Sequence, residues 1–218
     1  FTRIMGMAQN ACGDWMIGGT PGINPQLAAV LDCEQDKNLI RITEVAPLVF
    51  PGLLQTGDYT RWIITRSVTD VDEKEIQTRA LLRIARAEAL TRKREPVEFH
   101  AVVGATAFRG KVGGSQVMRD QLEHVRDMAH LDNVTLQAID LEQDSTFAHS
   151  GAFILYEFRD LPSAVYLEHL ATCAVLVEDA DVATYKAAAE TLRREAMSPA
   201  DTLGLIADVI PTDLETTK

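Results

Sequence analysis

Two glutamates and two tyrosines of this chain have side chains that could carry out acid–base chemistry. Glu157 and Glu168 each fall in a segment that reads as a strand, with Tyr156 and Tyr166 close by. Paired carboxylates can serve as general acid and general base. Such residues more commonly form the polar face of a half-exposed sheet. Glu157, Glu168, Tyr166 and Arg109 are the first suspects for an enzyme. They assemble no recognisable catalytic set, and we predict no catalytic residue.

Three arginines share one face of a predicted helix. Arg79, Arg83 and Arg86 are four and three residues apart. This spacing can form a stripe that binds an anion or a partner protein. The alternative is a solvated face on which Glu75 pairs with Arg79 one turn away. Because runs of charge on a helix usually stay in solvent, the sequence alone favours the solvated face.

The sequence lacks the common patterns of metal and phosphate sites. Its five histidines are scattered and show no zinc-ligand spacing. The run Gly113-Gly114-Ser115 has neither the ending of a phosphate-binding loop nor a dinucleotide fingerprint, so we interpret it as a helix start. Cys173 lies in an apolar segment, where a cysteine is usually inert. We therefore expect no metal and no cofactor.

The charge of the chain is acidic and unevenly distributed. The 218 residues carry a net charge of −11, with 46% apolar residues, enough for a substantial core. Residues before Asp140 contain 17 acids and 16 bases, whereas those from Asp140 onward contain 15 acids and 5 bases. Such a chain repels a phosphate backbone and is by itself a poor nucleic-acid binder. Three widely spaced cysteines and the lack of a membrane-length apolar run favour the reducing cytoplasm.

The first third of the chain predicts helices around one ambiguous segment. We interpret residues 1–23 as a linker or residual segment. Asn24 caps a predicted helix that runs to about Asp36, with Pro25 at its first position. Residues 39–45 alternate enough for a strand but could equally continue the helix. Residues 59–66 predict a short helix.

The middle of the chain carries the strongest helical signal, over residues 72–93. Residues 97–103 then predict a buried strand, and Gly113 to Ser115 open a second amphipathic helix. The first helix has an apolar stripe made of Ile76, Ala80, Leu81, Ile84, Ala85 and Leu90. The inward face predicted for the second helix consists of Val117, Met118, Leu122, Val125 and Met128.

The last third predicts three strands and two helices. Residues 134–141 form the first strand, and residues 152–158 and 164–169 form a hairpin. A helix over residues 181–197 precedes a last one, which Ser198 caps and Pro199 begins. We predict an α+β fold in which N-terminal helices precede a mixed, mostly antiparallel sheet with packing helices; α/β is the fallback. One domain would span residues 24–210, with a flexible tail at 211–218.

The run from Pro51 to Arg61 reads as a turn, two apolar anchors and a helix start. Pro51 presets a turn and Gly52 tolerates positive φ. Thr56 or Asp58 can cap the helix that begins near Tyr59. None of these residues is a convincing nucleophile, metal ligand or phosphate cradle, so the run indicates a fold signature.

With this run and several spaced motifs, the chain resembles the domain of unknown function that follows an XRE-type helix-turn-helix in many actinobacterial regulators. The resemblance covers about residues 24–210. It departs from the family pattern at Ala87, Ala105 and Asp140, where relatives often carry Gln, Glu and Pro. The matching positions include Pro51 to Thr56, Tyr59, Arg61, Arg83, Arg86, Arg109, Gly113, Met118, Gln121, Leu122, Asn133 to Thr135, Gln137, Gly151, Phe153, Phe158, Val165, Tyr166, Glu168, Leu192, Arg193, Ser198, Pro199, Leu205 and Ile206.

The resemblance implies a non-enzymatic regulatory domain that binds a small molecule or a partner protein and forms a homodimer. It also implies a small partner protein encoded nearby, and DNA contact only through a separate helix-turn-helix, which residues 1–23 are too short to hold. An enzyme of hydrolase or transferase type and a purely structural dimerisation module remain alternatives. We take as candidate ligand- or partner-binding residues Arg83, Arg86, Arg109, Gln121, Tyr166 and Glu168.

Overall fold

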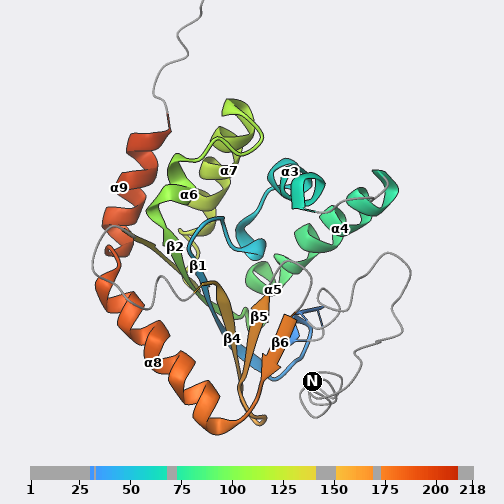
Figure 1. Ribbon diagram of the computed structural model, residues 1–218, viewed down its shortest axis with the longest axis vertical. Helices are drawn as coiled ribbons and strands as arrows, with labels where there is room; N and C mark the ends of the chain where they lie inside the picture. Colours follow the sequence, from blue (N-terminus) through green and yellow to red (C-terminus); the bar gives the residue numbers. More distant parts are fainter. Residues whose placement is uncertain (1–29, 32, 68–72, 141–150, 169–172, 211–218) are drawn as a thin grey trace, which may run out of the picture.

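A six-stranded sheet forms the centre of the computed structural model, which describes residues 30, 31, 33–67, 73–140, 151–168 and 173–210 (Figure 1). The strand order is β3-β2-β1-β4-β5-β6. β1 pairs in parallel with β2, and β2 with β3, whereas the other three pairings are antiparallel. The predicted α+β class with a mixed, mostly antiparallel sheet is therefore confirmed. The strands are β1 (Leu39–Ala46), β2 (Glu98–Gly104), β3 (Val134–Ile139), β4 (Phe153–Phe158), β5 (Ala164–Glu168) and β6 (Cys173–Leu176).

Helical crossovers join the three parallel strands, because parallel neighbours cannot be linked by a tight turn. The β1–β2 crossover contains the 3-10 turn η1 (Gly52–Leu54) and the helices α3 (Gly57–Ser67), α4 (Glu73–Arg86) and α5 (Glu88–Thr91). The β2–β3 crossover contains α6 (Ala105–Arg109) and α7 (Ser115–Met128). β2 is buried on both faces, which explains its continuous apolar run.

The two faces of the sheet are covered by different helices. Ile42, Phe99 and Tyr156 belong to the larger core cluster, which also contains buried residues of the two crossovers. On the opposite face, Val45 and Leu155 pack in a cluster with α8 (Asp179–Glu195). Figure 1 shows α8 on one side of the sheet and α3, α4 and α5 on the other. α9 (Pro199–Val209) lies against β3, where the Thr202 hydroxyl accepts a hydrogen bond from the amide of Ala138 at 2.9 Å.

Several sequence predictions that rest on local signals are confirmed. The β4–β5 hairpin forms, α7 buries most of its predicted face, and the Ser198 side chain caps α9 with Pro199 as the first helical residue. Residues 39–45 are a strand, and residues 30, 31, 33 and 34 are helical. The predicted order of helices before strands holds only in part, because β1 precedes α3.

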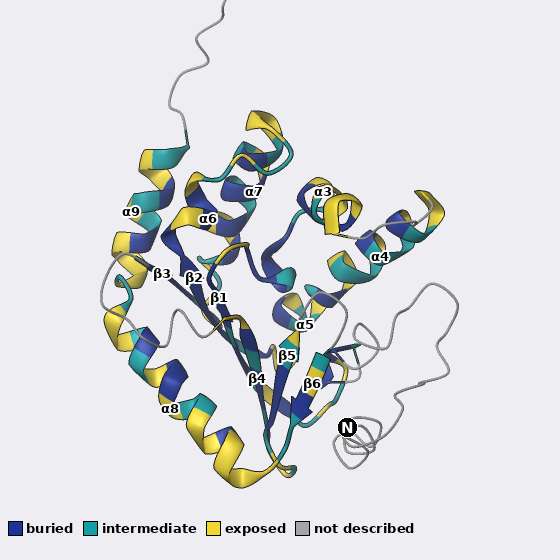
Figure 2. Cartoon of the chain, viewed as in Figure 1, coloured by how far each residue is buried: buried dark blue, intermediate teal, exposed yellow. Residues whose placement is uncertain are grey.

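The long helix predicted for residues 72–93 is instead two helices, α4 and α5, separated at Ala87. Its predicted apolar stripe is wrong at three positions. Leu81 and Ile84 are 68% and 44% exposed, and Ala85 is exposed as well. Arg86, which we placed on a solvated face, is buried instead. Figure 2 shows this mixture of exposed and buried positions along α4.

Two short elements were not predicted, namely α6 and the edge strand β6. Other predictions concern positions outside the described residues. These are the linker at 1–23, the capping of the first helix by Asn24 and Pro25, the strand end at Leu141, the strand end at His169 and the tail at 211–218. None of the helices in the described ranges combines the length and apolarity needed to cross a bilayer.

Two glycine substitutions should have opposite effects on stability. Gly204 is exposed within α9, and a Cβ there would meet no atom within 4 Å. Gly204→Ala should therefore stabilise the chain by about 0.5–1 kcal/mol. Gly113 has a φ of +71°, and its Cβ would lie 2.7 Å from Cγ1 of Val117.

Gly113→Ala should accordingly destabilise the chain by more than about 1 kcal/mol. Gly114→Ala is the matched control, since Gly114 also has a positive φ but open space around it. Urea unfolding measures all three variants. A Gly113→Ala effect no larger than that of Gly114→Ala would contradict the close contact with Val117.

Candidate functional site

The run that begins at Pro51 folds into a rigid connection at the carboxyl end of β1. The carbonyl of Pro51 accepts a hydrogen bond from the amide of Leu54 at 2.9 Å, which closes the 3-10 turn. Leu53 and Leu54 are buried anchors. The Thr56 hydroxyl accepts from the amide of Tyr59 at 3.4 Å, so Thr56 has the predicted capping role, although α3 begins at Gly57.

Gln55 connects this run to α4. Its Nε2 donates to the carbonyl of Phe50 at 2.6 Å. Its Oε1 accepts from the hydroxyl of Thr60 at 3.1 Å and from Nη1 of Arg83 at 3.2 Å. The buried amide of Gln55 therefore fixes where the Arg83 guanidinium lies.

Gln121 holds the same run from the side of α7. Its Nε2 donates to the carbonyl of Leu54 at 2.6 Å, and its Oε1 accepts from the amide of Thr56 at 2.8 Å. The side chain is fully buried. Both ends of the amide are thus engaged by the backbone, which makes Gln121 a support of the connection.

Arg86 and Glu34 form a buried, two-pronged ion pair. Nε and Nη2 of Arg86 donate to the two carboxylate oxygens of Glu34 at 2.6 and 2.7 Å. Their side chains are only 6% and 3% exposed. The interpretation of the arginine stripe as a solvated face is therefore wrong at Arg86, whereas Arg79 does pair with Glu75 as predicted.

Gly52 makes room for this ion pair. A Cβ at position 52 would lie 3.0 Å from Nη1 of Arg86. Burial by itself lowers the pKa of Arg86, but the charge and hydrogen bonds of Glu34 outweigh it and raise the pKa above its ordinary value. The guanidinium therefore stays charged, with its charge balanced by Glu34.

Glu44 lies on the same face of the sheet, at the middle strand β1. Its carboxylate accepts a hydrogen bond from the backbone of Gly52, yet its buried Oε2 has no hydrogen-bond partner. Burial raises the pKa of Glu44 to about 7, and the charge of Glu34 adds to this rise while Arg86 and Arg83 oppose it. Near neutral pH this carboxyl is therefore poised between its charged and neutral forms.

Arg83 has a different environment from Arg86. Its guanidinium donates to the neutral amide of Gln55, and within the described part of the chain no carboxylate lies within ion-pair distance of it. Burial and the neighbouring charge of Arg86 lower the pKa of Arg83, while Glu168 and Glu44 oppose this effect. Arg83 nevertheless retains some accessible surface.

Two tyrosines complete the cluster. The Tyr156 hydroxyl is fully buried without a hydrogen-bond partner, and burial together with the charge of Glu34 raises its pKa well above the ordinary value. Burial, Glu168 and the thiol of Cys173 likewise raise the pKa of Tyr166. Both hydroxyls therefore remain protonated. We call Glu34, Glu44, Arg83, Arg86, Tyr156 and Tyr166 the charged cluster.

Four of the six predicted binding residues meet at this cluster: Arg83, Arg86, Tyr166 and, at its exposed margin, Glu168. Gln121 supports the adjoining backbone, and Arg109 is exposed at the end of α6. Sequence reasoning missed Glu34 and Glu44, and it named Tyr156 only beside the glutamates suspected of acid–base chemistry. A signal for Glu44 did exist, because strand alternation places it on the same face as the apolar Ile42 and Ala46.

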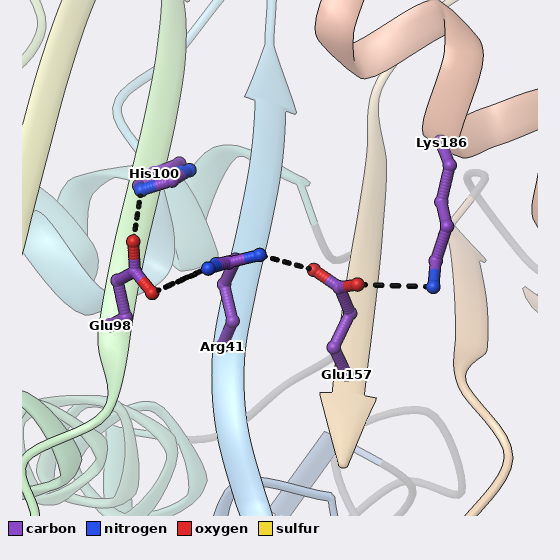
Figure 3. Close-up of polar contacts among 5 residues, drawn as sticks. All are labelled: Arg41, Glu98, His100, Glu157 and Lys186. Atoms are coloured by element: carbon purple, nitrogen blue, oxygen red, sulfur yellow. Dashed lines mark hydrogen bonds and ion pairs between the residues drawn. The ribbon is translucent and has the colours of Figure 1, made fainter. Parts of the chain in front are cut away.

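A second set of polar contacts crosses the opposite face of the sheet (Figure 3). Nε2 of His100 lies 2.8 Å from the carboxylate of Glu98, which also accepts hydrogen bonds from Arg41. The carboxylate of Glu157 lies 3.4 Å from Arg41 and 3.0 Å from Nζ of Lys186 on α8, so it links the two. Glu157 therefore lies on the α8 face, away from Tyr166. The residues suspected of acid–base catalysis do not converge in one place.

The titration of Glu44 should be visible in the stability of the chain. A carboxyl whose pKa rises from 4.5 to about 7 on folding binds a proton more tightly in the folded state. Its stabilising contribution is complete below pH 4.5 and is lost as the pH rises to about 7. Relative to Glu44→Gln, the wild type should lose up to roughly 3 kcal/mol across this range.

Urea unfolding of both proteins at several pH values measures this difference, and comparison with Glu44→Gln cancels the other titrating groups. A pH-independent difference would show that Glu44 has an ordinary pKa. Among the described residues, no group of three or more His, Cys, Asp or Glu side chains could hold a metal ion.

Comparisons with known proteins bear on the whole fold that carries this cluster. Neither a curated protein nor a solved structure matches the sequence. One family model does match, over residues 27–208, which include the run from Pro51, the three arginines of α4 and all six strands. The chain therefore belongs to the family described as "Domain of unknown function (DUF5753)".

Proposed function

We propose that this chain is the regulatory domain of a DNA-binding transcription regulator and that it binds a small-molecule effector at the charged cluster. One observation carries the proposal. The half-buried Arg83 guanidinium donates to a neutral amide, and its charge acts on the Glu44 carboxyl, whose buried Oε2 has no hydrogen-bond partner.

Such an arrangement is costly for folding alone. A buried polar atom without a partner destabilises a protein by about 1–3 kcal/mol. A fold that needed only stability would pair these groups or replace them with apolar side chains. Carboxyls with strongly raised pKa values also concentrate at functional sites. A ligand that supplies the missing partners gives these groups a role.

The rest of the proposal, on how the domain acts within a larger regulator, is based on its resemblance to the domain located after the helix-turn-helix of XRE-type regulators. On this basis we propose a cytoplasmic homodimer that contacts DNA only through a separate helix-turn-helix module. A small partner protein encoded nearby is a second proposed regulator. The acidic charge of the chain supports this division, because the domain itself repels DNA.

The alternative of an enzyme has less support. It would need Glu157, Glu168, Tyr166 and Arg109 to act together. Glu157 is engaged with Arg41 and Lys186 on the face opposite Tyr166. No observation favours this set as a reactive centre.

A thermal-shift screen of a small-molecule collection tests effector binding. A ligand at about 100 times its Kd stabilises the folded state by about 2.7 kcal/mol. For a chain of this size, the melting temperature should rise on the order of 5–10 °C. The decisive comparison is with Arg83→Gln, which should lose the shift.

Arg61→Gln on α3 is the matched control, since Arg61 is exposed and pairs with Asp58 of the same helix. It should keep the wild-type response. A compound that stabilises wild type and Arg83→Gln equally binds elsewhere, and that result would contradict the proposed location.

A further inference from the structure

The two arginines of the charged cluster differ in how their charges are balanced. Arg86 donates two hydrogen bonds to Glu34 and is neutralised by it. Arg83 donates to the amide oxygen of Gln55, and no carboxylate among the described residues lies within ion-pair distance of it. A guanidinium has five N–H donors, so Arg83 can still bind a further acceptor.

A carboxylate is the ligand group that matches Arg83 best. Its two oxygens fit the planar fork of a guanidinium, and such paired hydrogen bonds are among the strongest in proteins. The neighbouring ion pair of Arg86 and Glu34 adds no net charge. The local surplus is therefore the single positive charge of Arg83, which is opposed by the exposed Glu168, by Glu44 and, more weakly, by Glu34 of the ion pair.

The protonation state of Glu44 determines whether this site attracts or repels an anion. Held by the amide of Gly52, it has an Oε2 that is buried and lacks a partner. Ionised, this carboxylate would repel a bound anion. Protonated, it could donate an O–H hydrogen bond to the same anion.

From this geometry we propose that the charged cluster binds a small molecule through a carboxylate group, which pairs with Arg83 while Glu44 takes up one proton. The inference rests on the proposed effector site and specifies its ligand class. The proton comes from solvent and adds to Oε2 of Glu44, and no covalent bond of the ligand changes. An acidic ligand of this kind enters a site that is positive only when Glu44 is neutral.

The groups around Glu44 set the sign of the pH dependence. Arg83 and Arg86 face it from α4, Glu34 faces it from the helical residues before β1, and Tyr156 lies on β4. Of these, Glu34 is paired with Arg86, so the charge of Arg83 is the one that an ionised Glu44 offsets. Glu44 is the member that titrates near neutrality, where burial raises its pKa to about 7. Binding should therefore weaken as the pH rises through 7.

The test is a titration of the full chain with acetate and benzoate, followed by ¹H–¹⁵N NMR of the amide and arginine Nε–H signals. Acetamide serves as the neutral isostere of acetate, and methylammonium as a cation. We expect saturable shifts with the carboxylates, about tenfold weaker at pH 8 than at pH 6, and none with the two control compounds. Arg83→Gln should abolish the binding.

Two further variants keep the test decisive if Arg83→Gln folds poorly. Arg83→Lys retains the positive charge but loses the planar guanidinium that can donate two parallel hydrogen bonds. It should therefore bind acetate at least several-fold more weakly. Glu44→Gln should bind at pH 6 and pH 8 equally. Arg61→Gln should titrate like wild type.

No saturable shift with either carboxylate up to about 100 mM would overturn the proposal. Equal shifts with acetamide, or an unchanged pH dependence in Glu44→Gln, would overturn it too. The outcome remains separable from that of the proposed function. If screening hits depend on Arg83 but carry no anion, the effector site stands and the carboxylate class fails.

Discussion

Arg86→Met is expected to destabilise the chain by about 3–5 kcal/mol. The substitution leaves the Glu34 carboxylate buried at 3% exposure without the guanidinium that neutralises it. Because the whole stability of a domain is commonly about 5–15 kcal/mol, this single change should remove a large part of it. Urea unfolding at neutral pH measures the loss.

The double variant Glu34→Leu with Arg86→Met should recover most of that stability, since removing both charges abolishes the cost of leaving one of them unpaired. Arg41→Met is the matched control. Arg41 pairs with Glu98 at 2.8 Å, but its side chain is 40% exposed, so its loss should cost no more than about 1 kcal/mol. Equal effects of Arg86→Met and Arg41→Met would contradict the burial of the ion pair.

Gln121→Leu should cost about 2–4 kcal/mol, because it leaves the carbonyl of Leu54 and the amide of Thr56 without the partners that Gln121 now supplies. The connection between β1 and α3 should loosen first. Hydrogen exchange of the Thr56 and Tyr59 amides should accelerate more than that of β2.

Gln116→Leu on the same helix provides the comparison. Gln116 is exposed and bonds, among the described residues, to Asp120, so its replacement should change the free energy of unfolding by less than about 0.5 kcal/mol. If Gln121→Leu proved equally mild, the amide would not be the support that holds this connection.

The sequence predicts those parts of the fold whose signals are local. The Ser198–Pro199 helix start, the inward face of α7 and the β4–β5 hairpin each depend on residues within a few positions of one another. The direction of strand pairing is not local. Nothing in residues 39–46 indicates that β1 lies parallel to β2 and antiparallel to β4.

The charged cluster shows why a site can escape sequence reasoning. Arg86 resembles any helical arginine until Glu34, 52 residues earlier, is seen to meet it. The exposure of Leu81 goes with this contact, because α4 buries Arg86 and leaves Leu81 on its outer side. The resemblance did single out Arg83, Arg86 and Tyr166, whereas only the alternation of residues 42–46 pointed to Glu44.

The run from Pro51 to Thr56 acquires a physical meaning from these contacts. Gly52 leaves space for the Arg86 guanidinium, and Gln55 holds Arg83. Leu53 and Leu54 anchor the turn in the core. The run therefore positions the charged cluster without having to contact a ligand itself.

Native mass spectrometry of the full chain, compared with its denatured mass and with Arg83→Gln, tests the proposed effector site most directly. We predict a dimer that carries a discrete small-molecule mass, lost on denaturation and missing from Arg83→Gln. A wild-type chain without any additional mass, or the same adduct retained by Arg83→Gln, would contradict effector binding at the charged cluster. A monomer would contradict the proposed dimer.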